Sequence, residues 1–152
     1  AKQLGVERAA AQAYIDAYFM EYPAVKTFMD ETITKAHQQG YVETLFGRRL
    51  YMPNINARNI HQQKGAERAA INGPMQGTAA DIIKMAMLDV DKHLSEDTPM
   101  IMQVHDELVF EAPASKAEKI AKEIQKTMEN TAKLSIPLIV EIGIGDNWDE
   151  AH

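Results

Sequence analysis

The longest helical pattern in the chain limits the folds that the sequence can adopt. From Lys64 to about Leu94, apolar residues recur at helical spacing and can form one buried face. Pro74 lies inside this pattern. Because proline lacks an N–H and its ring crowds the preceding turn, we expect it to kink or break the helix. The residues expected on the buried face are Ile71, Met75, Ile82, Met85 and Leu88.

Two shorter helical patterns and a hairpin pattern come before this helix. Residues 7–21 are rich in alanine and place apolar side chains at helical spacing, which indicates an amphipathic helix. Pro23 suits the first turn of a second helix, and Gly40 suits its left-handed end. Apolar and polar residues then alternate on both sides of Phe46 and Gly47, which predicts a short hairpin.

A second strand pair is predicted after the long helix. Two apolar, β-rich runs, MIMQV and LVFEA, meet at His105 and Asp106. Ser115 and Glu118 have the spacing of a capping box, which predicts the start of a helix. The run LIVEIGI at 138–144 predicts a last strand. Together these elements predict an α+β fold in which helices pack on a small antiparallel sheet.

The composition narrows the class of protein. A chain of 152 residues can form one domain with a core, or parts of two domains, and 45% hydrophobic with 25% charged residues indicates a folded protein. No cysteine is present, so any bound metal must be held by oxygen or imidazole ligands. No apolar run approaches the ~20 residues of a membrane helix and no signal pattern opens the chain. We therefore expect a soluble protein that is not exported and acts in the cytoplasm, with no membrane partner.

The net charge of −6 has the wrong sign for a protein that coats nucleic acid, but the charge is unevenly distributed. Residues 48–68 carry five basic residues against the single acid Glu67. A polyanion would be expected to bind this window, although such a cluster can also be a solvated face. The basic residues are Arg48, Arg49, Arg58, Lys64 and Arg68.

The tetrapeptide VHDE carries the strongest chemical signal. Two-residue turns favour glycine or Asn-Gly because their central residues can need positive φ, whereas this turn must use His105, Asp106 and Glu107. Residues held at a turn against their preference suggest a functional site, but a polar turn at a sheet edge is a common alternative. Two adjacent carboxylates suit a hard cation such as Mg²⁺, and one such pair is normally half of a two-metal site.

A polar row lies on the long helix. Arg68, Asn72 and Gln76 are four residues apart, which keeps them on one face. They could donate to phosphates, sugars or the acceptors that every base pair offers in the minor groove. A polar stripe facing water explains the same spacing.

Four segments of the chain together closely resemble the C-terminal region of the A-family DNA polymerases of the bacterial DNA polymerase I type. The segments are GYVETLFGRRLYMP, ERAAINGPMQGTAADIIK, QVHDELVFE and the ending GDNWDEAH, and the resemblance extends over essentially the whole chain. It implies that VHDE is the second acidic motif of the palm. Asp106 would then be a metal-binding aspartate, Glu107 an auxiliary acid near the metals, and His105 a contact to the primer terminus.

The same resemblance implies roles for the remaining candidates and for the parts that are missing. Arg68, Asn72 and Gln76 would follow primer and template in the minor groove. On the predicted hairpin, Arg48 and Arg49 are further candidates for nucleic-acid contact. The first acidic motif of the family and its nucleotide-binding fingers helix do not occur in this sequence. Residues 1–62 would be the C-terminal part of the fingers subdomain, and residues 63–152 the C-terminal part of the palm.

The resemblance implies DNA-templated DNA synthesis for the complete protein. The primer 3′ hydroxyl would attack the α-phosphate of a deoxynucleoside triphosphate at a site with two Mg²⁺ ions. The partners would be primer-template DNA, deoxynucleoside triphosphates and the remainder of the polymerase chain, and the isolated chain is expected to be inactive. A metal-dependent nuclease and a non-catalytic DNA-binding module are the alternatives.

Overall fold

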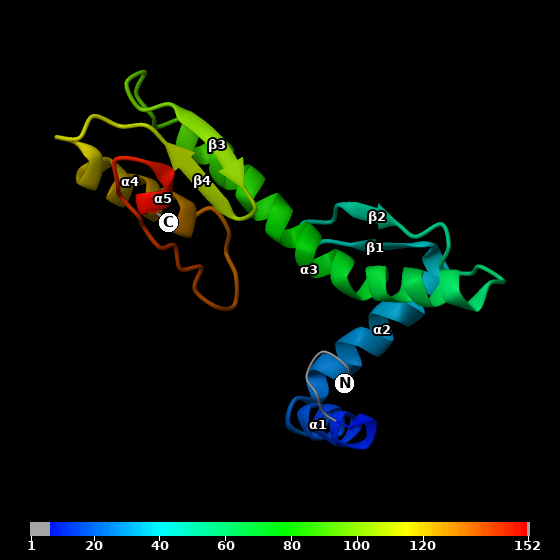
Figure 1. Cartoon of the computed structure of the whole chain (residues 1–152). Coiled ribbons are helices and arrows are strands. Elements are labelled where there is room, and N and C mark those ends of the chain that lie inside the picture. Colours follow the sequence, from blue (N-terminus) through cyan, green and yellow to red (C-terminus); the bar gives the residue numbers. More distant parts are fainter. Residues whose placement is uncertain (1–6, 152) are drawn as a thin grey trace. The chain divides into compact units, whose positions relative to one another are not determined.

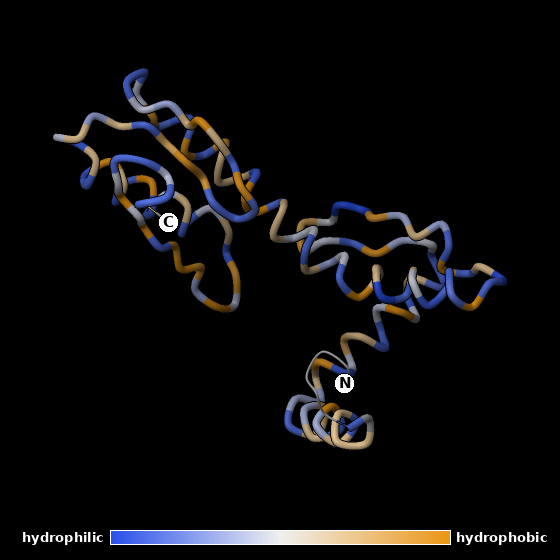
Figure 2. The backbone as a smooth tube through the Cα atoms, in the orientation of Figure 1, coloured by the Kyte–Doolittle hydropathy of each residue, from blue (hydrophilic) through white to orange (hydrophobic). Residues whose placement is uncertain are grey.

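The computed structural model describes residues 7–151, which divide between Gly77 and Thr78 into two compact units. Figure 1 shows the helices and strands of each unit. Along both units, Figure 2 shows hydrophobic and hydrophilic residues intermixed within the helices, as in elements that bury one face. The predicted α+β class is confirmed. The elements are α1 Arg8–Glu21, α2 Pro23–Gln39, β1 Tyr41–Glu43, β2 Arg49–Tyr51, α3 Ile60–Asp91, β3 Met100–Val104, β4 Glu107–Phe110, α4 Ala117–Glu129 and α5 Trp148–Ala151.

The two N-terminal helices and their boundaries are as the sequence predicts. Pro23 occupies the first turn of α2, where its missing N–H has no helical partner to lose. Gly40 ends α2 with a φ of 78°, and its N–H donates to the carbonyl of Ala36 over 2.8 Å. The chain then continues directly into β1.

The first unit is built on the β1–β2 hairpin, which lies against α3. The strands are antiparallel, and Val42 pairs with Leu50 on the face that contacts α3. Val42 is part of a small buried core with Leu50 packed against it. The buried members of this core are Ala36, Val42, Ile55 and Ala70.

Pro74 was predicted to kink or break the helix; α3 runs through it as one helix, so a break is excluded. The hairpin packs against α3 on both sides of the proline. A Cβ added at Gly73 would lie 3.1 Å from Val42 Cγ2, and one at Gly77 would lie 2.7 Å from Thr44 Cγ2. The absence of a side chain at both glycines therefore allows the hairpin to lie close to α3.

The predicted buried face of α3 is also partly wrong. Met75 and Leu88 are 56% and 57% exposed, whereas Ala70, Ala86 and Val90 are 0 to 1% exposed. The prediction assumed one apolar face along the whole helix. Each unit instead buries its own residues of α3, and small side chains at these contacts allow close approach of the neighbouring elements.

α3 begins earlier than predicted. Asn59 precedes its first residue, and the Asn59 side-chain oxygen accepts the N–H of His61 over 2.9 Å.

The second unit combines the β3–β4 hairpin with α4 and the C-terminal part of α3. Its core contains Ala86 and Val90 of α3 and Met128 of α4, with Leu108 and Phe110 of β4 packed against it. The strands are antiparallel, and an irregularity in register falls between Met100 and Met102. The hairpin is thereby held by its apolar side chains on a helical layer.

Two local predictions in this unit fail. Residues 138–144 form no strand, and at Val140 the backbone bonds to side chains of α4. Gln125 Nε2 donates to the carbonyl of Val140 over 2.6 Å, and the N–H of Val140 donates to Glu129 Oε1 over 3.2 Å. The predicted capping box is absent: the residue before α4 is Lys116, and no side chain caps the helix.

Within residues 7–151, no helix is both long enough and apolar enough to cross a membrane. α3 has the length, but its sequence contains polar and charged residues throughout.

Candidate active site

The β3–β4 hairpin presents the VHDE tetrapeptide at its turn. Val104 pairs with Glu107, so His105 and Asp106 are the two central residues of a tight turn. His105 has a φ of 52° and is the non-glycine residue with positive φ in the part of the chain that the structure describes. The side-chain amide of Gln103 donates to the carbonyl of His105 and supports this conformation. The unusual turn that the sequence indicated is therefore present.

Left-handed backbone conformations are uncommon for residues with a Cβ and cost about 1 kcal/mol or more. Histidine tolerates this region better than most residues, but glycine would adopt it without strain. The turn thus keeps a less favourable residue, and His105 and Asp106 are both exposed at its tip. Backbone preference does not explain the choice of residue.

The two carboxylates differ in their surroundings. Asp106 is exposed, and no described residue forms a hydrogen bond or ion pair with its side chain. Glu107 is half-buried as the first residue of β4. Asp106 is therefore available to a ligand at the turn, while Glu107 is held closer to the sheet.

The carboxylates of Asp106 and Glu107 are ligands suited to a hard divalent cation, but two carboxylates do not complete its coordination shell. Mg²⁺ is typically bound through one or two carboxylates and completes its shell with water and substrate phosphate. Among residues 7–151, no group of three or more histidine, aspartate or glutamate side chains is arranged to hold a metal ion. Asp106 and Glu107 would thus supply part of a coordination shell.

The polar row of α3 lies in the first unit. Arg68, Asn72 and Gln76 are all exposed, and none of them bonds to another side chain in the described chain. At about 100° per residue, they occupy a different face of α3 from Gly73 and Gly77, which contact the hairpin. The structure therefore leaves all three donors open to a ligand, as both interpretations of the row require.

The two hairpin arginines make contacts inside the first unit. Arg48 Nη2 donates to the carbonyl of Gly77 over 2.9 Å and so joins the hairpin to α3. Arg49 Nε donates to Glu43 Oε1 over 3.1 Å, and its guanidinium lies 4.6 Å from the ring centre of Tyr41. The Glu43 carboxylate raises the pKa of Arg49 above its ordinary value. Both arginines have a structural part, and their contact with nucleic acid remains a prediction.

A polar network that was not predicted from the sequence lies near the start of α3. Glu67 Oε2 accepts from Lys64 Nζ over 2.7 Å, and Glu67 Oε1 lies 3.2 Å from His37 Nε2. His37 Nδ1 in turn lies 2.8 Å from Asn56 Oδ1. The Lys64 ammonium lowers the pKa of Glu67, and His37 adds to this effect. The three-residue spacing of Lys64 and Glu67 is the one local signal of this network.

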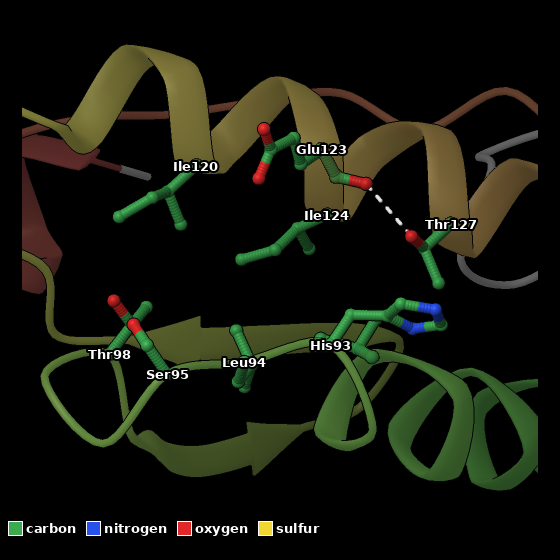
Figure 3. A pocket seen from close by; sticks show the side chains of 9 residues that line it. His93, Leu94, Ser95, Thr98, Ile120, Glu123, Ile124 and Thr127 are labelled. Carbon is green, nitrogen blue, oxygen red and sulfur yellow. Dashed lines mark hydrogen bonds between the residues drawn. The ribbon is translucent and has the colours of Figure 1, made fainter.

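A small hollow lies elsewhere in the second unit, between α4 and residues 93–98, and Figure 3 shows its lining. Its volume is about 70 Å³, and Thr127 Oγ1 donates to the carbonyl of Glu123 at one side. The Thr98 hydroxyl is buried without a hydrogen-bond partner. None of the predicted site residues lines this hollow, so the predicted chemistry does not depend on it.

Comparison with known proteins gives a consistent result along the chain. The family model described as DNA polymerase family A matches residues 1–150. DNA polymerase I of Pseudomonas aeruginosa is 56% identical over 155 aligned residues, which cover 100% of this chain and 17% of that protein. The thermostable DNA polymerase I of Thermus aquaticus is 45% identical and covers 97% of this chain and 18% of its own length. The chain thus spans about a sixth of these relatives.

A solved structure is similar over the same range. The POL domain of Pol1 from M. smegmatis, in complex with DNA primer-template and dNTP, matches with a TM-score of 0.93 and 35% identity. The match covers 99% of this chain and 27% of that one.

Proposed function

The chain belongs to DNA polymerase family A. We propose that it is the part of a DNA-directed DNA polymerase that carries one half of the metal site. The observation that carries the proposal is the β3–β4 turn. There, a left-handed His105 precedes two adjacent carboxylates, and the side chain of Asp106 is exposed.

Asp106 and Glu107 are the residues that would hold Mg²⁺. When bound, Mg²⁺ neutralises charge on the triphosphate and favours ionisation of the primer 3′ hydroxyl. Asp106 contributes a carboxylate at the turn, and Glu107 contributes a second one from the first position of β4. His105, next to them and exposed, would donate to the primer terminus. The rigid hairpin orients these groups before substrate arrives, which is the main task of the protein in phosphoryl transfer.

The α3 row would hold the duplex. Arg68, Asn72 and Gln76 offer exposed donors on one helix face, and such donors can reach the acceptors that all base pairs share in the minor groove. Contacts of this kind are independent of sequence, as a polymerase requires. Arg48 and Arg49 would contact nucleic acid from the neighbouring hairpin.

We assign residues 1–62 to the fingers and residues 63–152 to the palm of the complete enzyme. The substrates would be primer-template DNA and deoxynucleoside triphosphates. The remainder of the polymerase would supply the second aspartate and the nucleotide-binding helix, since neither motif occurs in this sequence. The isolated chain should therefore be unable to extend a primer.

The isolated chain can be incubated with Mg²⁺, primer-template and nucleotides to test this proposal. Binding without extension is the expected result, with extension only in the complete enzyme. Degradation of the DNA by a sample free of contaminating nuclease would favour a nuclease. Binding without extension by the complete enzyme as well would indicate a non-catalytic DNA-binding module.

The α3 row can be tested in the complete enzyme by replacing Arg68, Asn72 or Gln76 with alanine. Loss of a shared groove contact should weaken binding on every template sequence and reduce discrimination against mismatched primer ends. If Arg68 contacts a phosphate, Arg68→Ala should also lower the salt dependence of binding. Unchanged affinity, salt dependence and mismatch discrimination in all three variants would mean that the row is only a solvated face.

A further inference from the structure

The β1–β2 hairpin has an outward face that none of the roles above explains. Val42 and Leu50 point towards α3, where they contact the Gly73 position. Because side chains alternate along a strand, the pairs that flank them point the opposite way. This outward face consists of the paired residues Tyr41 and Tyr51 and the paired residues Glu43 and Arg49.

The two tyrosines are not equivalent. Their ring centres are 5.8 Å apart, but the Arg49 guanidinium lies 4.6 Å from the ring centre of Tyr41 and covers that ring. Tyr51 also forms a side-chain hydrogen bond with Arg49, but it is 71% exposed. Tyr51 is therefore the aromatic ring of this face that is open to a ligand.

The charge around this ring favours a nucleic acid and also limits the type of contact. Residues 48–68 are the basic window of the chain, and they include Tyr51. On the outward face itself, however, Glu43 pairs with Arg49 over 3.1 Å. A phosphate is not favoured beside this ion pair, whereas an uncharged base can stack on the ring.

We propose that the outward face of the β1–β2 hairpin is a stacking site for an unpaired base of single-stranded DNA, with Tyr51 as the stacking residue. The proposal rests on the polymerase function above, because a template strand has unpaired bases ahead of the primer end. Bases inside a duplex are already stacked on their neighbours, so the site would distinguish the single strand from the duplex. Cations elsewhere in the basic window would attract the backbone, and Tyr51 would add a base contact.

The test compares two DNA probes on the complete polymerase. One is a primer-template with an unpaired 5′ overhang, and the other is a blunt duplex with the same base pairs. Tyr51→Ala should weaken binding of the overhang probe roughly 5- to 100-fold, the loss typical of one stacked base. Blunt-duplex affinity and the salt dependence of binding should be unchanged, because no phosphate contact is lost. Tyr51→Phe should retain the affinity, since it keeps the ring.

Tyr14 provides a matched control because it is also 71% exposed but lies on α1. Tyr14→Ala should leave both probes bound as in the wild type. Equal loss of both probes in Tyr51→Ala, or no loss, would overturn the proposal. If Tyr51→Ala lowered the melting temperature but left the preference for the overhang probe unchanged, Tyr51 would be covered by another part of the polymerase. The stacking proposal would then be wrong.

A second measurement does not depend on a variant. In the wild-type enzyme, an overhang carrying 5-iododeoxyuridine should form a photo-crosslink to Tyr51 on irradiation. Crosslinks that map only to other residues would contradict the proposal even if Tyr51→Ala did not fold. Failure of the wild type to bind or extend primer-template would refute the proposed function, whereas normal extension with unchanged Tyr51→Ala binding would refute only the stacking site.

Discussion

The β1–β2 and β3–β4 hairpins are both short and antiparallel, but they make their turns in different ways. The β1–β2 turn uses Gly47 at a φ of 81°, and its N–H donates to the carbonyl of Thr44 over 3.0 Å. The Thr44 hydroxyl also accepts the N–H of Arg48 over 3.1 Å. The β3–β4 turn instead places His105 at a φ of 52°. One turn uses the residue that its backbone prefers, and the other does not.

This difference separates a hairpin whose turn follows its backbone preference from the hairpin that carries the candidate catalytic residues. The first hairpin is fixed by its glycine and by close packing on α3. The second accepts strain at His105, and the residue that follows is a carboxylate that no described side chain contacts. Strain that persists beside an exposed carboxylate is typical of a functional site.

The largest effect is expected from Asp106→Asn in the complete polymerase. The amide keeps the shape of the side chain but removes the charge that a hard cation requires, so kcat should fall by several orders of magnitude. Affinity for primer-template should change little. Steady-state primer extension measures the first quantity and equilibrium binding the second. Glu111→Gln, an exposed acid just after β4, is the control and should extend normally.

At the contact between the first hairpin and α3, the largest effect should come from Gly77→Ala, a change on the helix. The added Cβ would lie 2.7 Å from Thr44 Cγ2, so the hairpin must move away from α3. We expect a loss of about 1–3 kcal/mol in the free energy of unfolding, measured by chemical denaturation. Gly65→Ala is the matched control on the same helix, because its Cβ would meet only Arg68 Nη2 at 4.0 Å. If both variants unfolded at the same denaturant concentration, close packing at Gly77 would not be important.

The two turns should respond in opposite directions to exchanges with glycine. Gly47→Ala places a Cβ at positive φ and should destabilise the protein by about 1 kcal/mol. His105→Gly relieves strain and should leave stability unchanged or raise it by less than about 1 kcal/mol. The same variant should slow primer extension, because it removes the proposed contact to the primer terminus. Loss of stability in His105→Gly without slower primer extension would contradict the proposed role of His105 and leave it a structural turn residue.

The smallest effect concerns pH and the network at the start of α3. Lys64 lowers the pKa of Glu67 below its ordinary value of 4.5, so the folded state favours the ionised carboxylate. The resulting stabilisation is present above that value and is lost as the pH falls through the lower folded pKa. Melting temperatures measured from neutral pH to below 4.5 should show this loss in the wild type. In Glu67→Gln, this part of the pH dependence should be absent.

The sequence predicted elements well where local residues determine the backbone. Pro23 and Gly40 mark the ends of α2, and Gly47 marks the first hairpin turn, because each has a backbone preference that its neighbours do not override. The unusual turn at His105 was also detectable, since no glycine is available there. The candidate residues Asp106 and Glu107 were identified in the same way, from the VHDE tetrapeptide between two apolar runs.

The predictions that failed depend on contacts between distant segments. Whether 138–144 forms a strand depends on a partner strand, and the backbone of Val140 is held by α4 instead. Pro74 lies inside a continuous α3 between two glycines that contact the hairpin. The contact between His37 and Glu67 joins residues 30 positions apart and has no local pattern that would predict it.

Metal binding can be measured to decide whether the β3–β4 turn carries half of a metal site. The complete polymerase, with a dideoxy-terminated primer-template and a matching nucleotide, can be titrated with Mn²⁺ and followed by electron paramagnetic resonance. We expect Asp106→Asn to bind Mn²⁺ more weakly than the wild type or not at all, while Glu111→Gln binds it normally. Equal stoichiometry and affinity for Mn²⁺ in the wild type and Asp106→Asn would mean that Asp106 is not a metal ligand.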